Sequence, residues 1–224
     1  MISREKLLEA AARVYAECGF RGATTRRIAE EAGVNEVTIF RHFGSKAALI
    51  DEAVRIQSAG PWSSHPQLPA EPVDPERELG AWASAYVNHL RANRSLIRKT
   101  MGEIEERPEA APCAAEPTMC AGNDLRQYMI RMFDAGFAPR GQRRSTGRNE
   151  DAYAAGAMLM SALFGDAMGR DVMPDMYPQP ADEAPAMYVR LFLCAIGAAE
   201  PANRTSATRR RGAGPRLAPR KNRS

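Results

Sequence analysis

The sequence lacks any run of about eighteen apolar residues, so no membrane-spanning helix is expected. It also lacks the apolar core of a signal peptide, since a charged amphipathic pattern begins at the N-terminus, and this predicts a cytoplasmic protein. Only four scattered cysteines are present, whereas a disulfide scaffold of this size would carry more. Cys113 and Cys120 are too widely spaced for a zinc knuckle and have no histidine nearby, so we expect no metal and no cofactor.

Charge of one sign does not dominate either, because the formal net charge of the 224 residues is only +4. Residues 200–224 hold eight of the 31 basic residues and one of the 27 acidic ones, which leaves 23 basic and 26 acidic residues in 1–199. This basic tail has few large apolar residues, so it is predicted to be disordered. A hydrophobic content of 44% is typical of a globular protein.

Strand-like alternation is nearly absent, whereas the 3.6-residue periodicity of amphipathic helices is frequent, which predicts an all-α fold. Four prolines within residues 58–73 exclude a helix interior there and indicate a linker. The predicted organisation is a unit of short helices over 1–57, a linker over 58–73, a helical domain over 74–199 and the basic tail over 200–224.

Within the helical domain, the periodicity predicts helices over 74–104, 123–136, 150–170 and 183–198. A break is expected over 106–122, where prolines and a glycine cluster. The last two helices are apolar nearly all round, so each must be buried on more than one side. In a chain of this length we expect the second side to meet another copy, which predicts a homodimer through 150–170 and 183–198.

The most informative stretch is TRRIAEEAGVNEVTIFRHFGSK, from Thr25 to Lys46. A small Ala29 permits two helices to cross closely, Gly33 suits a turn with positive φ, and Ile39 lies on the inward face of the second helix. This spacing predicts a helix-turn-helix. Phe40 and Phe43 are expected to pack inward beside Ile39.

The outward face of the second helix carries hydrogen-bonding side chains long enough to reach base edges in a DNA groove. Lys46 lies in the first turn of the next helix, where its charge opposes the helix dipole unless a phosphate docks there. Thr25 and Arg26 open the first helix of the motif and are also within reach of phosphate. The outward candidates are Asn35, Glu36, Thr38, Arg41 and His42.

Residues 3–55 closely resemble the N-terminal DNA-binding domain of TetR-like (AcrR-like) regulators, which implies a three-helix helix-turn-helix domain. The resemblance covers about a quarter of the chain and is specific, since the order and spacing of a dozen positions agree. The matching positions are Gly22, Ala23, Thr24, Thr25, Arg26, Ala29, Ala32, Gly33, Val34, Thr38, His42, Phe43, Ser45, Lys46 and Leu49.

The resemblance implies a homodimer whose recognition helices enter successive major grooves of a near-palindromic operator on double-stranded DNA. It also implies a C-terminal domain that dimerises and binds a small effector, which releases the DNA. Phe40 stands where the family often has a tyrosine, and it cannot form the hydroxyl bond to phosphate. By carry-over, the backbone is touched by Thr25, Arg26, Thr38, Phe40, His42 and Lys46, and bases are read by Asn35, Glu36, Val37 and Arg41.

An apolar effector cavity is expected in the helical domain, because methionine adapts to varied ligand shapes and Asn93 is a polar group on an otherwise apolar face. For each of these residues, packing in an ordinary core is the alternative. The candidates are Trp82, Tyr86, Asn93, Met101, Tyr128, Met132 and Phe133.

The sequence thus favours a ligand-released transcriptional repressor and not an enzyme. One alternative is an accessory DNA-binding protein without an effector, which binds partly through its arginine-rich tail. Another is an all-α enzyme fused to a DNA-binding head. The enzyme hypothesis has little support, because the three histidines are distant in sequence and no phosphate-binding glycine loop or nucleophile elbow is present.

Overall fold

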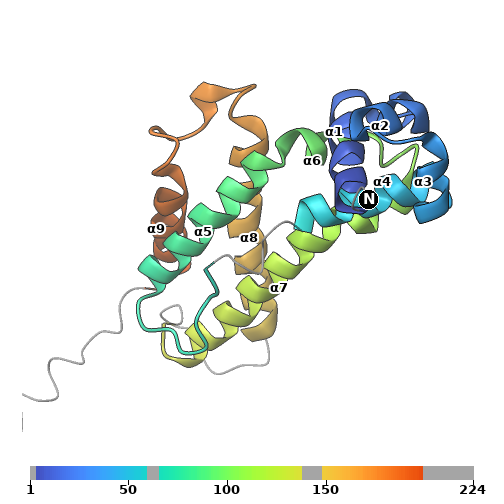
Figure 1. Ribbon diagram of the computed structural model, residues 1–224. Coiled ribbons are helices and arrows are strands. Elements are labelled where there is room, and N and C mark those ends of the chain that lie inside the picture. The colour runs from blue at the N-terminus through green and yellow to red at the C-terminus, as the bar shows by residue number, and fades with distance from the viewer. Residues whose placement is uncertain (1–3, 60–65, 138–147, 199–224) are drawn as a thin grey trace, which may run out of the picture.

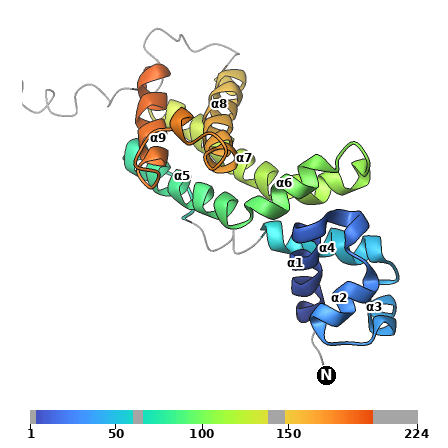
Figure 2. The same cartoon turned by 90° about the horizontal axis from the view of Figure 1, so that it is seen from above.

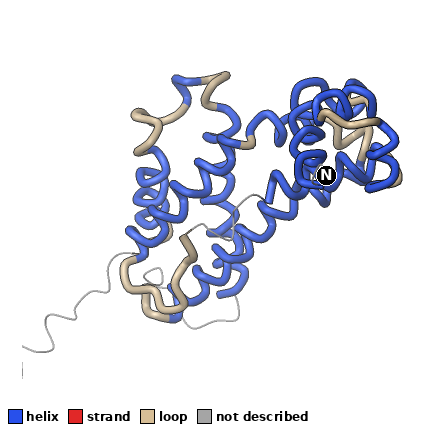
Figure 3. The backbone as a smooth tube through the Cα atoms, viewed as in Figure 1, coloured by secondary structure: helices blue, strands red, loops and turns tan. Residues whose placement is uncertain are grey.

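The computed structural model describes residues 4–59, 66–137 and 148–198, which form helices joined by loops with no strand among them (Figure 1, Figure 3). The predicted all-α fold is therefore confirmed. No helix in these ranges is both long and apolar enough to cross a membrane. The tail at 200–224, for which disorder is predicted, lies outside the described residues.

An N-terminal unit is built from four helices whose starts are set by local side chains. The side-chain oxygens of Thr24, Asn35 and Ser45 each accept a hydrogen bond from a backbone N–H in the first turn of the helix that follows. These caps satisfy N–H groups that have no partner within the helix. The helices are α1 (Arg4–Gly22), α2 (Thr25–Ala32), α3 (Glu36–Phe43) and α4 (Lys46–Ala59).

One apolar core holds the N-terminal unit together, with buried side chains from all four helices. Leu96, from the C-terminal part of the chain, belongs to the same cluster, so the core crosses from one unit to the other. The largest fully buried members within residues 4–59 are Leu7, Tyr15, Ile28, Ile39, Leu49 and Ile50.

A C-terminal unit (residues 75–137 and 148–198) has its own core, formed mainly by α5, α7, α8 and α9. Asp74 caps α5, and Pro75 occupies its first turn, as the sequence suggests. The helices are α5 (Pro75–Ala92), α6 (Arg94–Gly102), α7 (Ala111–Asp134), α8 (Arg148–Gly169) and α9 (Ala184–Ala195), with short 3₁₀ turns at Pro108–Ala110 and Pro174–Met176.

The single helix predicted over 74–104 is wrong, because the chain breaks at Asn93 into α5 and α6. Asn93 has φ −104° and ψ 12°, and its Nδ2 donates to the carbonyl of His89 at 3.1 Å. A side-chain amide that bonds the backbone competes with the helical hydrogen-bond ladder, and the break follows from this competition. Asn93 therefore lies at a helix junction and not on a continuous apolar face.

The break predicted over 106–122 is also wrong for most of its length, because α7 begins at Ala111 and continues through this stretch. Pro112 falls in the first turn of α7, where a missing N–H has no helical partner to lose. The prediction rests on a cluster of prolines and a glycine, and proline density does not separate a helix start from a loop.

The two units pack directly on each other. Residues of α6 contact α1, and residues of α7 contact α4. Figure 2 shows α6 and the first part of α7 lying along the N-terminal unit, while α5, α8 and α9 form the opposite end of the molecule. The position of α3 is thus fixed with respect to the C-terminal unit through α1 and α4.

Candidate nucleic-acid interface

A helix-turn-helix is formed by α2 and α3. Gly33 takes the left-handed conformation (φ 68°, ψ 38°) directly after α2, and the N–H of Val34 donates to the carbonyl of Ala29 at 2.9 Å. Ala29 and Ile39 are both buried, which brings the two helices close. The motif predicted from the positions of these residues is confirmed.

α3 presents most of its surface to solvent. Within its eight residues only Ile39 is fully buried, and Phe43 is partly buried under the guanidinium of Arg4, which lies 5.0 Å from its ring centroid. The prediction that Phe40 packs inward is wrong, because its side chain is 49% exposed. A helix advances about 100° per residue, so Phe40 is turned away from the face that Ile39 and Phe43 share.

The side chains predicted to read bases line this open face. Val37 is 70% exposed, Asn35 and Arg41 are exposed, and Glu36 is half-buried. His42, which is predicted to touch the DNA backbone, is exposed as well. Asn35 has a structural task too, since its Oδ1 accepts from the N–H of Val37 at 2.9 Å as the cap of α3. The face therefore offers amide, guanidinium, imidazole and apolar groups, which are the types that contact base edges in a major groove.

Two of the predicted DNA contacts bind each other. The hydroxyl of Thr25 at the start of α2 donates to Oε1 of Glu36 at the start of α3. This bond ties the two helix N-termini together and uses the hydroxyl proton that was predicted for phosphate. Thr38, two residues further along α3, is half-buried.

Arg26 is engaged only at the surface. Its Nε lies 3.0 Å from Oε1 of Glu30, in an i,i+4 pair with both side chains largely exposed. Such a pair contributes little to stability, so the guanidinium can exchange the carboxylate for a phosphate at small cost.

Lys46, the first residue of α4, is half-buried and already bonded. Its Nζ donates to the carbonyl of Phe20 at 2.8 Å and lies 4.1 Å from the centroid of the Phe20 ring. An ammonium has three N–H donors, so two remain for a phosphate. The lysine predicted to bind phosphate is therefore held in one position by the end of α1.

The seven effector candidates divide into two groups. Trp82 and Tyr86 stack with ring centroids 5.3 Å apart, and together with Tyr128, Met132 and Phe133 they are buried in the C-terminal core. Asn93 instead lines a cleft of about 440 Å³ between the two units, and the side chain of Met101 is 51% exposed at the end of α6. The structure brings the first five together and leaves these two outside.

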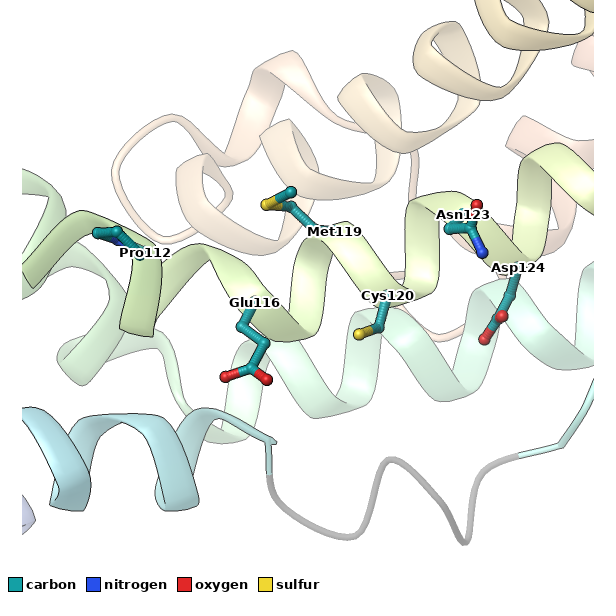
Figure 4. A pocket seen from close by; sticks show the side chains of 6 residues that line it. All are labelled: Pro112, Glu116, Met119, Cys120, Asn123 and Asp124. Carbon is teal, nitrogen blue, oxygen red and sulfur yellow. The ribbon is translucent and has the colours of Figure 1, made fainter.

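Two open cavities of the C-terminal unit lie along α7, much of which falls in the stretch where the sequence predicted a break. One groove of about 510 Å³ is lined by Pro112, Glu116, Met119, Cys120, Asn123 and Asp124 (Figure 4). A second, of about 330 Å³, lies between α7 and α8, and its walls include Gly122, Arg126, Gly156 and Met160. None of the seven candidates lines either groove, and only a correct start for α7 could have placed these residues on one helix face.

The outer faces of α8 and α9 leave large apolar side chains uncovered. Tyr153 and Met158 on α8 and Leu191 on α9 are each more than half exposed. The inner faces of the same helices, with Leu159, Leu163, Val189 and Phe192, are buried in the core. These are the two helices whose all-round apolarity predicts contact with a second copy.

No local pattern in the sequence marks the ionic cluster at the end of α8. Asp166 is fully buried, accepts from Arg91 at 2.9 Å and from the hydroxyl of Tyr188 at 3.0 Å, and is also paired with Arg170. Burial raises the pKa of Asp166, but the hydrogen bonds from Arg170, Arg91 and Tyr188 outweigh it and hold the pKa below its usual value of 3.8. The cluster ties α5, α8 and α9 together.

Within the described ranges, no three histidine, cysteine, aspartate or glutamate side chains are placed to hold a metal ion. The groups that the structure does assemble at α2, α3 and the start of α4 are hydrogen-bonding and cationic, and they are mounted on a rigid helical motif. This arrangement is suited to binding a duplex of nucleic acid.

Comparison with known proteins agrees with this site. Residues 7–53 match a family described as bacterial regulatory proteins, tetR family. The uncharacterized HTH-type transcriptional regulator YvkB of Bacillus subtilis (strain 168) is 41% identical over 163 residues, which cover 73% of this chain and 80% of YvkB. The chain therefore belongs to the tetR family of bacterial regulatory proteins, which confirms the resemblance seen in the sequence.

Two further comparisons show how far the similarity extends along the chain, in sequence and in fold. The HTH-type transcriptional repressor KstR2 of Rhodococcus jostii (strain RHA1) is 28% identical over 102 residues, covering 46% of this chain and 50% of KstR2, so the chain spans about half the length of that repressor. A crystal structure described as a tetR-family transcriptional regulator from Mesorhizobium loti MAFF303099 matches with a TM-score of 0.67 at 19% identity, over 87% of this chain and 96% of that chain. The latter shows the shared fold.

Proposed function

We propose that the protein is a sequence-specific DNA-binding regulator of transcription. In this proposal it acts as a homodimer, represses by occupying a near-palindromic operator, and is released from the operator by a small apolar effector. The observation that carries the proposal is the open face of α3, on a helix-turn-helix that lies within the residues matching the tetR family. Repression is supported by the name of KstR2, a transcriptional repressor.

The division of labour at the DNA follows from chemistry and position. Arg41, Asn35, Glu36 and Val37 lie on the face of α3 that would enter a major groove, where base edges present donors, acceptors and thymine methyl groups. The proposed backbone contacts, which position the motif on the duplex, come from Thr25, Arg26, Thr38, His42 and Lys46. With its side chain 49% exposed and no hydroxyl, Phe40 is suited to apolar contact and not to a hydrogen bond.

A homodimer is supported by the uncovered apolar side chains of α8 and α9. Tyr153 and Met158 on α8 and Leu191 on the adjacent α9 are exposed apolar side chains that water disfavours and that a second copy would cover. Two copies joined there would carry two α3 helices, and a two-fold arrangement reads a near-palindrome.

A small apolar effector is supported by the C-terminal unit. Its grooves along α7, of about 510 and 330 Å³, are within the size range of ligand sites, and they lie beside a core rich in aromatic and methionine side chains. The five buried candidates, from Trp82 to Phe133, would be reached by an effector only if the core opens around it.

The deciding experiment is selection of bound sequences from a random duplex pool, with the full chain and with a chain that ends at residue 199. We expect enrichment of a near-palindrome with half-sites about one helical turn apart, and we expect the shortened chain to retain it. If no sequence is enriched, the regulator proposal fails.

The tail favours a second candidate function. Its eight basic residues against one acidic residue suit sequence-independent binding to phosphates. An accessory DNA-binding protein without an effector would bind random and selected duplexes with equally steep salt dependence, and it would lose its binding when the chain ends at residue 199.

A further inference from the structure

A carboxylate of the C-terminal unit holds the end of α1. The backbone of α1 leaves helical geometry at Gly19 (φ 70°, ψ −178°), and the N–H of the next residue, Phe20, donates to Oε1 of Glu103 at 2.8 Å. The other oxygen of the same carboxylate, Oε2, accepts from the buried hydroxyl of Tyr15 at 2.9 Å. Glu103, directly after α6, thus binds α1 on both sides of the kink.

Gly19 makes this approach possible. A Cβ at this position would overlap with Oε1 of Glu103, and a positive φ is in any case a conformation that glycine adopts most easily. The kink at Gly19 and the Glu103 carboxylate therefore depend on each other. The kink leaves room for the carboxylate, and the carboxylate accepts a hydrogen bond from the N–H of Phe20.

Phe20 connects the Glu103 contact to the proposed DNA-binding surface. Its carbonyl accepts from Lys46 Nζ at 2.8 Å. Its ring is contacted by the same ammonium, 4.1 Å from the ring centroid, and by the guanidinium of Arg107, 3.6 Å from it. Arg107 also donates from Nη2 to Oδ1 of Asp51 on α4, at 2.7 Å. A continuous chain of contacts thus runs from Glu103 and Arg107 to the first turn of α4.

We propose that Glu103 is a positioning residue for DNA binding: it fixes Phe20, whose carbonyl holds the Lys46 ammonium ready for a phosphate. This inference rests on the proposed function, because it requires that the start of α4 contacts DNA. Glu103 itself touches no DNA in this proposal. Its effect on affinity comes from the order it imposes on Lys46 before the duplex arrives.

The donors to Glu103 keep their protons over the whole useful pH range. Burial, joined by the hydrogen bond to Glu103, raises the pKa of Tyr15 to about 12. A backbone N–H does not titrate. Neither donor to Glu103 is therefore lost by deprotonation near neutral pH.

The test compares Glu103→Gln with Glu105→Gln, using the full chain and the duplex enriched by the wild type. Both variants lose one negative charge on the same turn, but Glu105 is exposed, whereas Glu103 is half-buried and bonds α1. Charge loss alone predicts slightly tighter binding. Loss of positioning predicts weaker binding for Glu103→Gln only, by about tenfold, and a salt slope shallower by about one unit because one phosphate contact is lost.

A double-mutant cycle with Lys46→Met shows whether the effect passes through the lysine. We expect Glu103→Gln to change the affinity little in the Lys46→Met background, although it lowers the melting temperature in both backgrounds. A merely structural role would weaken DNA binding equally with and without Lys46. If Glu103→Gln does not fold, Tyr15→Phe removes one donor to the same carboxylate and is expected to weaken binding in the same direction.

The outcomes separate the two proposals. Failure of the wild type to enrich any sequence overturns the proposed function, and the positioning role falls with it. Selective binding by the wild type, together with equal affinities of Glu103→Gln and Glu105→Gln, overturns the positioning role alone.

Discussion

The N-terminal and C-terminal units differ in the surroundings of the apolar side chains that they expose. In the N-terminal unit the exposed large apolar side chains are Val37, Phe40 and Ile56, and the first two lie on α3 among polar groups. The C-terminal unit leaves Tyr153, Met158 and Leu191 exposed on two adjacent helices. A surface of mixed polar groups suits a hydrated polyanion, whereas an apolar face suits another protein surface, so the contrast indicates two different partners.

The units differ in their ion pairs as well. Pairs such as Arg26–Glu30 in the N-terminal unit have both side chains largely exposed. In the C-terminal unit the carboxylate of Asp166 is fully buried between Arg91 and Arg170. Removal of one partner of a buried pair is strongly destabilising, while an exposed pair contributes little.

The largest effect is therefore expected from Asp166→Ala. The substitution leaves Arg91 and Arg170 without their buried counter-charge and should lower the free energy of unfolding by about 3–5 kcal/mol. Urea denaturation measures this loss, with Arg26→Ala as the matched control, for which a change within about 0.5 kcal/mol is expected. Equal losses of unfolding free energy in the two variants would show that the buried ion pairs of the C-terminal unit stabilise no more than the exposed pairs of the N-terminal unit.

The same carboxylate gives a pH dependence. The pKa of Asp166 is lower in the folded state than its ordinary value of 3.8, so its stabilisation is complete at higher pH and is lost as the pH falls through the folded-state pKa. We expect the gap in unfolding free energy between the wild type and Asp166→Asn to be constant near neutrality and to shrink below about pH 4. A gap that widens on acidification contradicts the assignment.

Leu191→Asp tests the apolar face of α9. A charge at a side chain 62% exposed should not harm the monomer, but it should disrupt a dimer that covers this face. Sedimentation velocity is expected to show monomers, and operator affinity should fall by about a hundredfold, or about 2.7 kcal/mol. Val172→Asp, at an exposed apolar residue in the loop after α8, is the control and should leave the dimer intact.

Arg41→Ala and Lys46→Ala test the division of labour at the DNA. Arg41→Ala should relax preference at particular base pairs, at a cost of about 1–3 kcal/mol for the preferred sequence. Lys46→Ala should weaken binding about uniformly and reduce the salt slope by about one unit. Affinities for a panel of single-base variants of the enriched duplex distinguish the two, and if both substitutions alter preference alike, the assignment is wrong.

The smallest effect is expected from Gly33→Ala in the turn of the helix-turn-helix. Space is not limiting, because a Cβ there has no neighbour within 4 Å, but φ is 68°. The cost should be only that of the left-handed conformation, about 1–2 kcal/mol in unfolding free energy. Gly80→Ala, at an uncrowded position within α5, is the control and should be neutral or slightly stabilising.

Local chemistry explains how much of this structure was predictable. The caps at Asn35 and Ser45 and the turn at Gly33 act within a few residues, so the motif they define could be located from sequence. An apolar side chain such as Phe40 is predicted to face the core, but α3 has only eight residues and Ile39 alone is buried among them, so Phe40 lies outside its narrow buried face. The start of α7 was missed because proline suits a first helical turn as well as a loop.

Partners distant in sequence could not be found in this way. Asp166 and Arg91 belong to different helices and are 75 residues apart in sequence. Glu103 and Phe20, which are hydrogen-bonded, are 83 residues apart in sequence. Nothing in the local pattern marks these carboxylates among the 27 acidic residues. The effector candidates show the same limit, because five are core neighbours while Asn93 and Met101 lie elsewhere.

The helix α6 is anchored at both ends, and this has a mechanical consequence. At its start, Arg94 and Arg98 are paired with Asp171, which follows α8, and just after its end Glu103 holds α1. A nine-residue helix is only about 14 Å long and is stiff over that distance. The loop after α8 and the kink of α1 are therefore linked through one short, stiff element.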